Sequence, residues 1–66
     1  MIADAYRIYR EHVANNLDEG EIDNLFIGRF DDTEYHQALL YGVMRYYEIE
    51  GCVIEEDGYH YVFENL

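Results

Sequence analysis

Apolar residues recur at helical spacing over most of the chain. Near the N-terminus they form one stripe with charged residues on the opposite side, which predicts a helix over residues 2–16. The stripe consists of Ile2, Ala5, Tyr6, Tyr9 and Val13. Asp18 followed by Glu21 has the spacing of a capping box and predicts a short second helix that ends near Gly28. The residues of this helix expected to face inward are Ile22, Leu25 and Phe26.

A third, longer helix is predicted after Asp31, a good N-cap residue, and should end at about Glu50 with Gly51 as its left-handed terminator. Its expected core stripe is Tyr35, Ala38, Leu39, Gly42, Val43, Tyr46 and Ile49. A second apolar group lies largely on the opposite side: Leu40, Met44 and Tyr47. Either this helix is sandwiched between the other helices and the C-terminal segment, or the second group meets another chain, with a homodimer as the simplest case.

The C-terminal segment alternates with the period of a β-strand, and Asp57-Gly58 is the preferred pair for a two-residue type I′ turn. The face expected to pack on the helices pairs Cys52 with Phe63, Ile54 with Tyr61 and Glu56 with Tyr59. The other face is expected to be exposed, and it carries Val53, Glu55, His60 and Val62.

These elements predict a small single α+β domain over residues 1–66, with three helices followed by a C-terminal β-hairpin. This element order resembles that of a winged-helix domain. A chain of 66 residues makes one domain at most and buries only about 60% of its unfolded surface.

The charge balance excludes whole classes of partner. Fifteen acids face four arginines and no lysine, for a net charge of −11, and all of this charge lies after residue 17. Direct binding to nucleic acid or to an anionic membrane needs clustered Lys and Arg, so neither is expected. Eight tyrosines and three phenylalanines argue against disorder. We therefore expect a folded acidic protein.

Residues with catalytic chemistry are scarce. The chain has no serine, no lysine and a single threonine, and its five glycines never reach a phosphate-binding spacing. Cys52 is expected to be a buried structural thiol, and the three histidines lack metal-ligand spacing. We therefore expect no enzyme activity, no cofactor and no metal. A lone cysteine indicates a reducing compartment, and the charged N-terminus indicates neither a signal peptide nor a membrane span, so a cytoplasmic location is expected.

The acidity itself indicates a binding role. A small domain needs a net charge of only a few units for solubility, and the self-repulsion of a larger charge costs stability. Acidic side chains three or four positions apart on a helix lie about 5–6 Å apart, close to the phosphate spacing along a nucleic-acid strand. The acidic candidates are Asp18, Glu19, Glu21, Asp23, Asp31, Asp32, Glu34, Glu55, Glu56 and Asp57. The apolar and aromatic candidates are Leu40, Tyr41, Met44, Tyr47 and Tyr59.

In size, charge and tyrosine content the chain resembles the small acidic inhibitors of phages and mobile elements, including anti-CRISPR and anti-restriction proteins that mimic DNA. The resemblance implies that the protein occupies the basic surface of a nucleic-acid-binding partner in the host cytoplasm. The acidic hairpin tip would then be a nucleic-acid-binding wing with its charge reversed. The alternative is a small regulatory module, monomeric or homodimeric, that binds through the apolar face of the third helix.

Overall fold

The computed structural model describes residues 4–13 and 15–65 of the chain. Within them the elements follow the order α1 (Asp4–His12), α2 (Glu19–Leu25), β1 (Phe26–Asp31), α3 (Asp32–Leu40), α4 (Val43–Glu50), β2 (Gly51–Glu56) and β3 (Tyr59–Glu64). The predicted α+β class is confirmed. The described residues contain four helices and three strands, so the element order differs from the predicted one and the winged-helix likeness is not confirmed. The stripe residue Ile2 lies outside the described residues.

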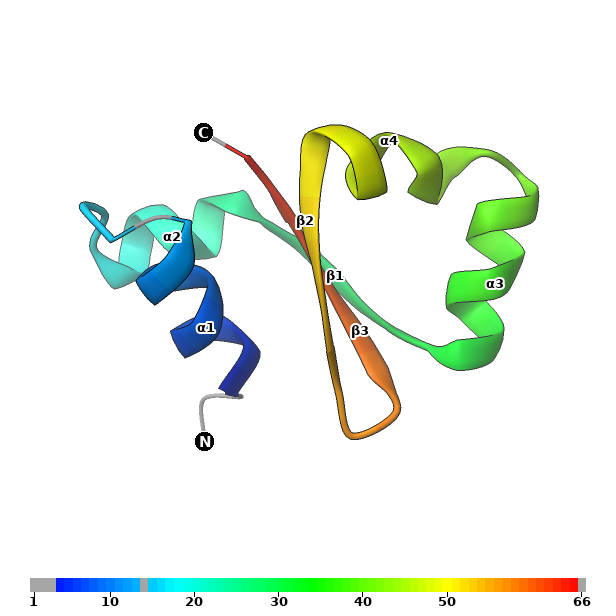
Figure 1. The fold of residues 1–66 in the computed structure, drawn as a ribbon, viewed down its shortest axis with the longest axis horizontal. Coiled ribbons are helices and arrows are strands. Elements are labelled where there is room, and N and C mark those ends of the chain that lie inside the picture. The colour runs from blue at the N-terminus through cyan, green and yellow to red at the C-terminus, as the bar shows by residue number, and fades with distance from the viewer. Residues whose placement is uncertain (1–3, 14, 66) are drawn as a thin grey trace.

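The strands form one antiparallel sheet in the order β1-β3-β2, with β3 in the centre (Figure 1). The register predicted for the β2–β3 hairpin is confirmed at every pair, from Cys52 with Phe63 to Glu56 with Tyr59. Asp57 and Gly58 have φ angles of 52° and 81°, as a type I′ turn requires.

Strand β1 replaces the predicted end of the second helix. Asp18 caps α2 as predicted, but the helix stops at Leu25, and Phe26 begins a strand that pairs with β3. The register shifts between Phe26 and Gly28, which is a bulge. Because the bulge changes the side to which the strand's residues point, Phe26 packs with α1 and α2 while Phe30 packs on the opposite face.

The predicted third helix is two helices. Asp31 caps α3 as predicted, in a capping box with Glu34, but Gly42 adopts a φ of 83° and separates α3 from α4. The prediction for Gly51 is wrong, because its φ of −113° is not left-handed. Glycine is required there by space: a Cβ would lie 2.7 Å from the Phe63 carbonyl oxygen.

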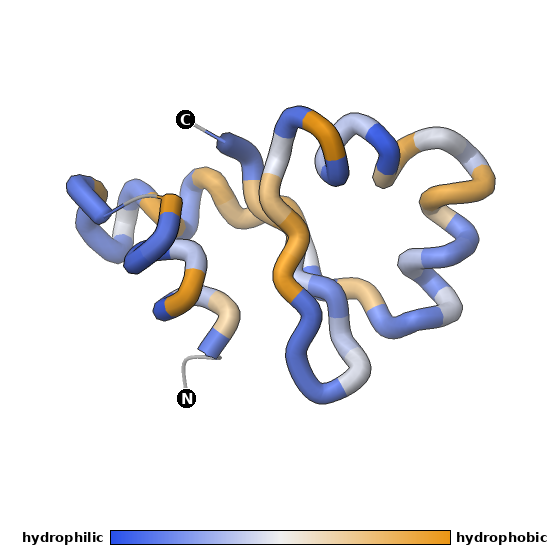
Figure 2. Tube along the Cα trace, in the orientation of Figure 1, coloured by the Kyte–Doolittle hydropathy of each residue, from blue (hydrophilic) through white to orange (hydrophobic). Residues whose placement is uncertain are grey.

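Helices cover both faces of the sheet, with α1 and α2 on one side and α3 and α4 on the other (Figure 1). The hydrophobic stretches of the trace converge on the strands between these layers (Figure 2). The prediction of an exposed second sheet face is therefore wrong: Val62 is fully buried and His60 is buried. The alternating strand pattern predicts which residues share a face of the sheet. It does not predict that α3 and α4 pack on the second face and bury it.

Aromatic stacks hold each helical layer to the central strand. On the first face the ring of Tyr9 stacks on Phe63, with centroids 4.1 Å apart, and the Tyr9 hydroxyl donates a hydrogen bond to the Glu64 carbonyl. On the second face the ring of Tyr35 stacks on His60 with centroids 3.9 Å apart. Each stack joins a helix to β3, so the middle strand is anchored from both sides.

Candidate functional site

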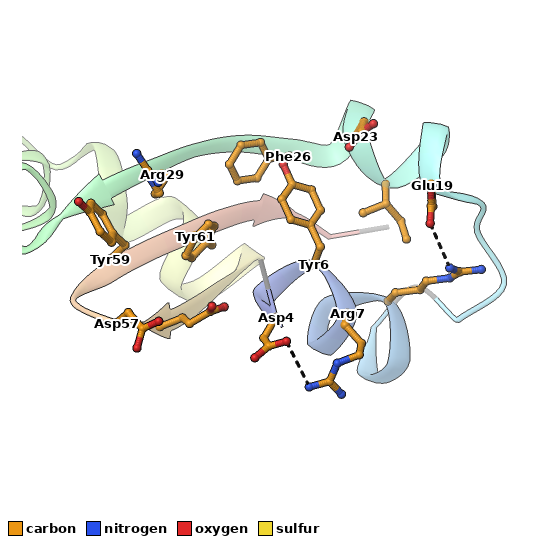
Figure 3. A pocket seen from close by; sticks show the side chains of 13 residues that line it. Asp4, Tyr6, Arg7, Glu19, Asp23, Phe26, Arg29, Asp57, Tyr59 and Tyr61 are labelled. Carbon is orange, nitrogen blue, oxygen red and sulfur yellow. Dashed lines mark ion pairs between the residues drawn. The ribbon is translucent and has the colours of Figure 1, made fainter. Parts of the chain in front are cut away.

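An open pocket of about 970 Å³ lies between α1, α2 and the sheet (Figure 3). It forms because α1 and α2 cover only part of the first sheet face. The part nearer the β2–β3 turn stays open. The pocket walls therefore come from both helices, from all three strands and from the turn.

The inner surface of the pocket is aromatic. Tyr6, Phe26 and Tyr61 lie next to one another, with ring centroids 5.0 Å apart for Tyr6 and Phe26 and 6.4 Å apart for Phe26 and Tyr61. Tyr59 continues this surface toward the turn. Burial raises the pKa of the Tyr6 hydroxyl, and the charge of Asp23 raises it further. The Tyr6 hydroxyl is therefore protonated at neutral pH and can donate a hydrogen bond in the pocket.

Carboxylates surround this aromatic surface. Asp4 lies at the start of α1, Glu19 and Asp23 on α2, and Glu56 and Asp57 at the hairpin tip (Figure 3). Four of these five were predicted as binding residues, in two clusters far apart in the sequence. The pocket brings these clusters together with the predicted residue Tyr59.

Three of the four arginines also line the pocket, and each is engaged by an acid or an aromatic ring. Arg7 lies 3.8 Å from Asp4, and Arg10 lies 3.9 Å from Glu19 (Figure 3). Exposed ion pairs of this kind contribute no more than about 1 kcal/mol. The guanidinium carbon of Arg29 lies 4.4 Å from the centre of the Tyr59 ring. This contact shows that the face of Tyr59 accepts a guanidinium.

Several of the predicted binding acids hold the fold together. Glu56 Oε1 accepts a hydrogen bond from the Ala5 backbone N–H at 2.6 Å, and so caps the first turn of α1. Asp18 accepts one from the Glu21 N–H at 2.8 Å, which caps α2. The caps at Asp18 and Asp31 follow from local spacing. The cap at Glu56 joins residues 51 positions apart, so no local pattern could predict it.

The third acidic cluster, Asp31, Asp32 and Glu34, lies outside this pocket but next to the hairpin tip. Asp31 pairs with Tyr59 across the sheet, and Tyr59 pairs with Glu56 on its other side. Buried His60 joins the two groups, because its Nε2 lies 2.6 Å from Asp32 Oδ1 and 4.0 Å from Glu55 Oε2. His60 is the cross-strand neighbour of Glu55 in the hairpin, and its side chain lies closer to Asp32 than to the Glu55 carboxylate.

The predicted apolar face of the third helix does not form. Leu40 and Tyr41 are largely exposed, whereas Met44 is only 2% exposed and Tyr47 is half-buried in the core beneath α4. The break at Gly42 explains the difference, because α4 runs in a different direction from α3 and turns different residues toward the sheet than a continuous helix would. The sequence contains one indication of this break. Leu40, Met44 and Tyr47 lie on the opposite side of a continuous helix from the core stripe, and two apolar sides of this kind are typical of two separate helices.

The remaining chemistry-bearing residues stay apart. Burial raises the pKa of the Cys52 thiol, which disfavours the reactive thiolate. Among residues 4–13 and 15–65, no three His, Cys, Asp or Glu side chains are grouped so that they could hold a metal ion. None of the helices in the described part of the chain is long and apolar enough to cross a membrane.

Comparison with known proteins gave no relative. No protein-family model matches the chain, and the searches of curated proteins and of solved structures returned no significant match.

Proposed function

We propose that the protein is a small acidic inhibitor that occupies the basic, nucleic-acid-binding surface of a partner protein, in the manner of a DNA or RNA mimic. The pocket carries this proposal, because it combines an aromatic surface with an acidic rim. Within the described residues two of the rim carboxylates, Asp23 and Asp57, make no ion pair, whereas Asp4 and Glu19 pair with arginines of the chain. An arginine side chain of the partner would stack on the aromatic rings and pair with the carboxylates, the two interactions that a guanidinium favours.

The contact between Arg29 and Tyr59 supports this mode of binding, since it is an example of the same interaction within the chain. The pocket opens beside the hairpin tip, where the acidic cluster around Asp32 also lies. A partner arginine in the pocket would thus be surrounded by further acids that attract the rest of a basic surface. The long-range attraction governs the rate of association and weakens as salt screens it.

The test uses a variant that removes charge from the site without removing a helix cap. Asp23→Asn and Asp57→Asn together meet this condition, and Asn at position 57 keeps a residue that tolerates the left-handed turn conformation. Glu56 is left unchanged because it caps α1. The matched control neutralises two exposed acids that do not line the pocket: Glu50→Gln and Glu64→Gln.

The first probe is a short arginine-rich peptide, titrated at low and high salt. We expect the site variant to bind it more than about tenfold more weakly than the control, because central charged contacts dominate such interfaces. The second probe is a nucleic-acid-binding protein captured with the tagged chain, from which added DNA or RNA should release the inhibitor. Equal binding by the two variants, or capture that resists both salt and nucleic acid, would contradict the proposal.

A further inference from the structure

The corner between α3 and α4 displays apolar side chains to solvent. Seven large hydrophobic residues are exposed within the described part of the chain, and five of them lie between residues 40 and 49. These five are Leu40, Tyr41, Val43, Tyr46 and Ile49, and they are called the corner surface below. Figure 2 shows hydrophobic positions at the turn between the two helices and again near the end of α4. An exposed apolar surface of this kind is typical of an interaction site.

The break at Gly42 creates this surface. One continuous helix would have directed Val43, Tyr46 and Ile49 toward the core, as their spacing predicts. After the break, Met44 and Tyr47 face the sheet instead, and Ile49 is 74% exposed. The corner surface thus joins the side of α4 that the fold leaves uncovered to the exposed residues Leu40 and Tyr41 at the end of α3.

We propose that a second copy of the chain covers the corner surface, giving a two-fold symmetric dimer. The distribution of charge favours a second copy at this place. Residues 40–49 contain one acid, Glu48, and one base, Arg45, in a chain whose net charge is −11. Two copies that meet here avoid bringing their acidic clusters together, whereas contact through the hairpin tip would oppose like charges.

A two-fold interface must also be complementary to itself, and the corner surface meets this requirement. Its apolar side chains would meet the same side chains of the other copy. Within residues 4–13 and 15–65, Arg45 has no ion-pair partner. One Glu48 oxygen accepts a hydrogen bond from the Tyr35 hydroxyl at 3.0 Å, which leaves the second oxygen for the Arg45 of the other copy.

A groove of about 620 Å³ beside the corner surface supplies a recess for the second copy. Its walls include Leu39, Leu40 and Ile49, and its polar positions are His36, Arg45 and Glu48. Tyr41 is 84% exposed and projects from the turn between the helices. A projecting aromatic residue and a nearby apolar groove on one surface allow each copy to fill the groove of the other.

The dimer and the proposed inhibitor function have opposite dependences on salt. Added salt screens the repulsion between two copies of charge −11, so dimerisation should strengthen as salt rises. Binding of a basic partner should weaken under the same conditions. The dimer does not use the pocket residues, so either proposal can fail without the other.

The test is sedimentation equilibrium of the purified chain from low to high micromolar concentration, at low and high salt. Leu40→Glu and Ile49→Glu each place a charge in the corner surface. Asn24→Asp adds the same charge at an exposed position of α2 and serves as the matched control. Far-UV circular dichroism establishes that each variant is folded.

We expect the wild type and Asn24→Asp to reach the mass of two chains as concentration and salt rise. The two corner variants should dissociate with constants more than about tenfold higher. A wild type that stays at the mass of one chain at the highest concentration and salt would overturn the proposal. So would folded corner variants that dimerise like the control. A variant that fails to fold is replaced by Leu40→Ser or Ile49→Ser, for which the same two outcomes apply.

Discussion

The orientation of α4 leads to a prediction about stability. The structure turns Met44 toward the sheet and leaves Ile49 exposed, although the sequence pattern placed Ile49 on the core stripe. The pattern places Ile49 on the core stripe and Met44 in a second apolar group on the opposite side of the helix. In the structure Met44 is 2% exposed and Ile49 is 74% exposed. Replacing each by alanine therefore tests which side of α4 faces the sheet.

The expected costs follow from burial. Truncating a fully buried Met to Ala lowers the free energy of unfolding by about 2–5 kcal/mol, since it removes apolar contacts and leaves a cavity. Full burial of an Ile side chain contributes about 1.5–3 kcal/mol, and Ile49 is only about a quarter buried, so its loss should cost less than about 1 kcal/mol. The higher helix propensity of Ala reduces this cost by a few tenths of a kcal/mol.

Urea denaturation followed by far-UV circular dichroism measures both costs. A domain of this length has a total stability of roughly 3–10 kcal/mol, so Met44→Ala removes a third or more of a typical value. With a urea slope near 1 kcal/mol per M, the midpoint of Met44→Ala should fall by about 2 M or more, and that of Ile49→Ala by less than about 1 M. The measurement is made at low micromolar concentration, where a dimer contributes least.

Equal costs at the two positions, or a larger cost for Ile49→Ala, would refute the assignment of Met44 to the core. That result would mean that α4 does not turn Met44 toward the sheet and Ile49 toward solvent. The corner surface would then not exist, and the proposed dimer would lose its basis.

Three further predictions concern other parts of the fold. Gly51→Ala should lower the free energy of unfolding by about 1–3 kcal/mol, because its Cβ would meet the carbonyl oxygens of Phe63 and Tyr47 at 2.7 and 2.9 Å. Gly20→Ala, where the nearest contact is an ordinary 3.4 Å, should not lower it in the same urea titration. Burial and the hydrogen bond to Glu48 raise the pKa of Tyr35 from 10.0 to about 12, so its contribution to stability is complete below pH 10 and is lost as pH rises toward 12. Tyr35→Phe should reduce the alkaline loss of the urea midpoint without abolishing it, because burial also raises the pKa values of Tyr6 and Tyr9, and an unchanged profile would contradict the assignment. Burial also raises the pKa of Cys52, so iodoacetamide should modify the native chain several times more slowly than the urea-unfolded chain at neutral pH, and equal rates would show an accessible thiolate.

Local patterns in the sequence determined the parts of this fold that depend on neighbours within a few positions. Asp18 and Asp31 were predicted as helix caps, and each accepts a hydrogen bond from a backbone N–H three residues later. The Asp57-Gly58 turn determined the register of the hairpin, because a two-residue turn leaves only one pairing of the strands. The charge of −11 likewise follows from the residues alone, whatever their arrangement.

The candidate site could be predicted only in part. The sequence identified the acids of α2 and of the hairpin tip, together with Tyr59, but could not show that they line one pocket. Arg29 was not predicted, although its place in β1 puts it over Tyr59. The structural role of Glu56 was also missed, since its partner Ala5 lies at the opposite end of the chain.

Tertiary structure decided the elements whose stability comes from distant partners. The six residues of β1 form a strand because β3 pairs with them, and a stretch this short has too little local preference to exclude the end of a helix. A glycine such as Gly42 costs a helix only about 1 kcal/mol, so sequence alone does not decide whether a helix continues through it. The helix ends there because breaking it lets Met44 and Tyr47 cover the second face of the sheet, and the gain from burying them outweighs that of a continuous helix.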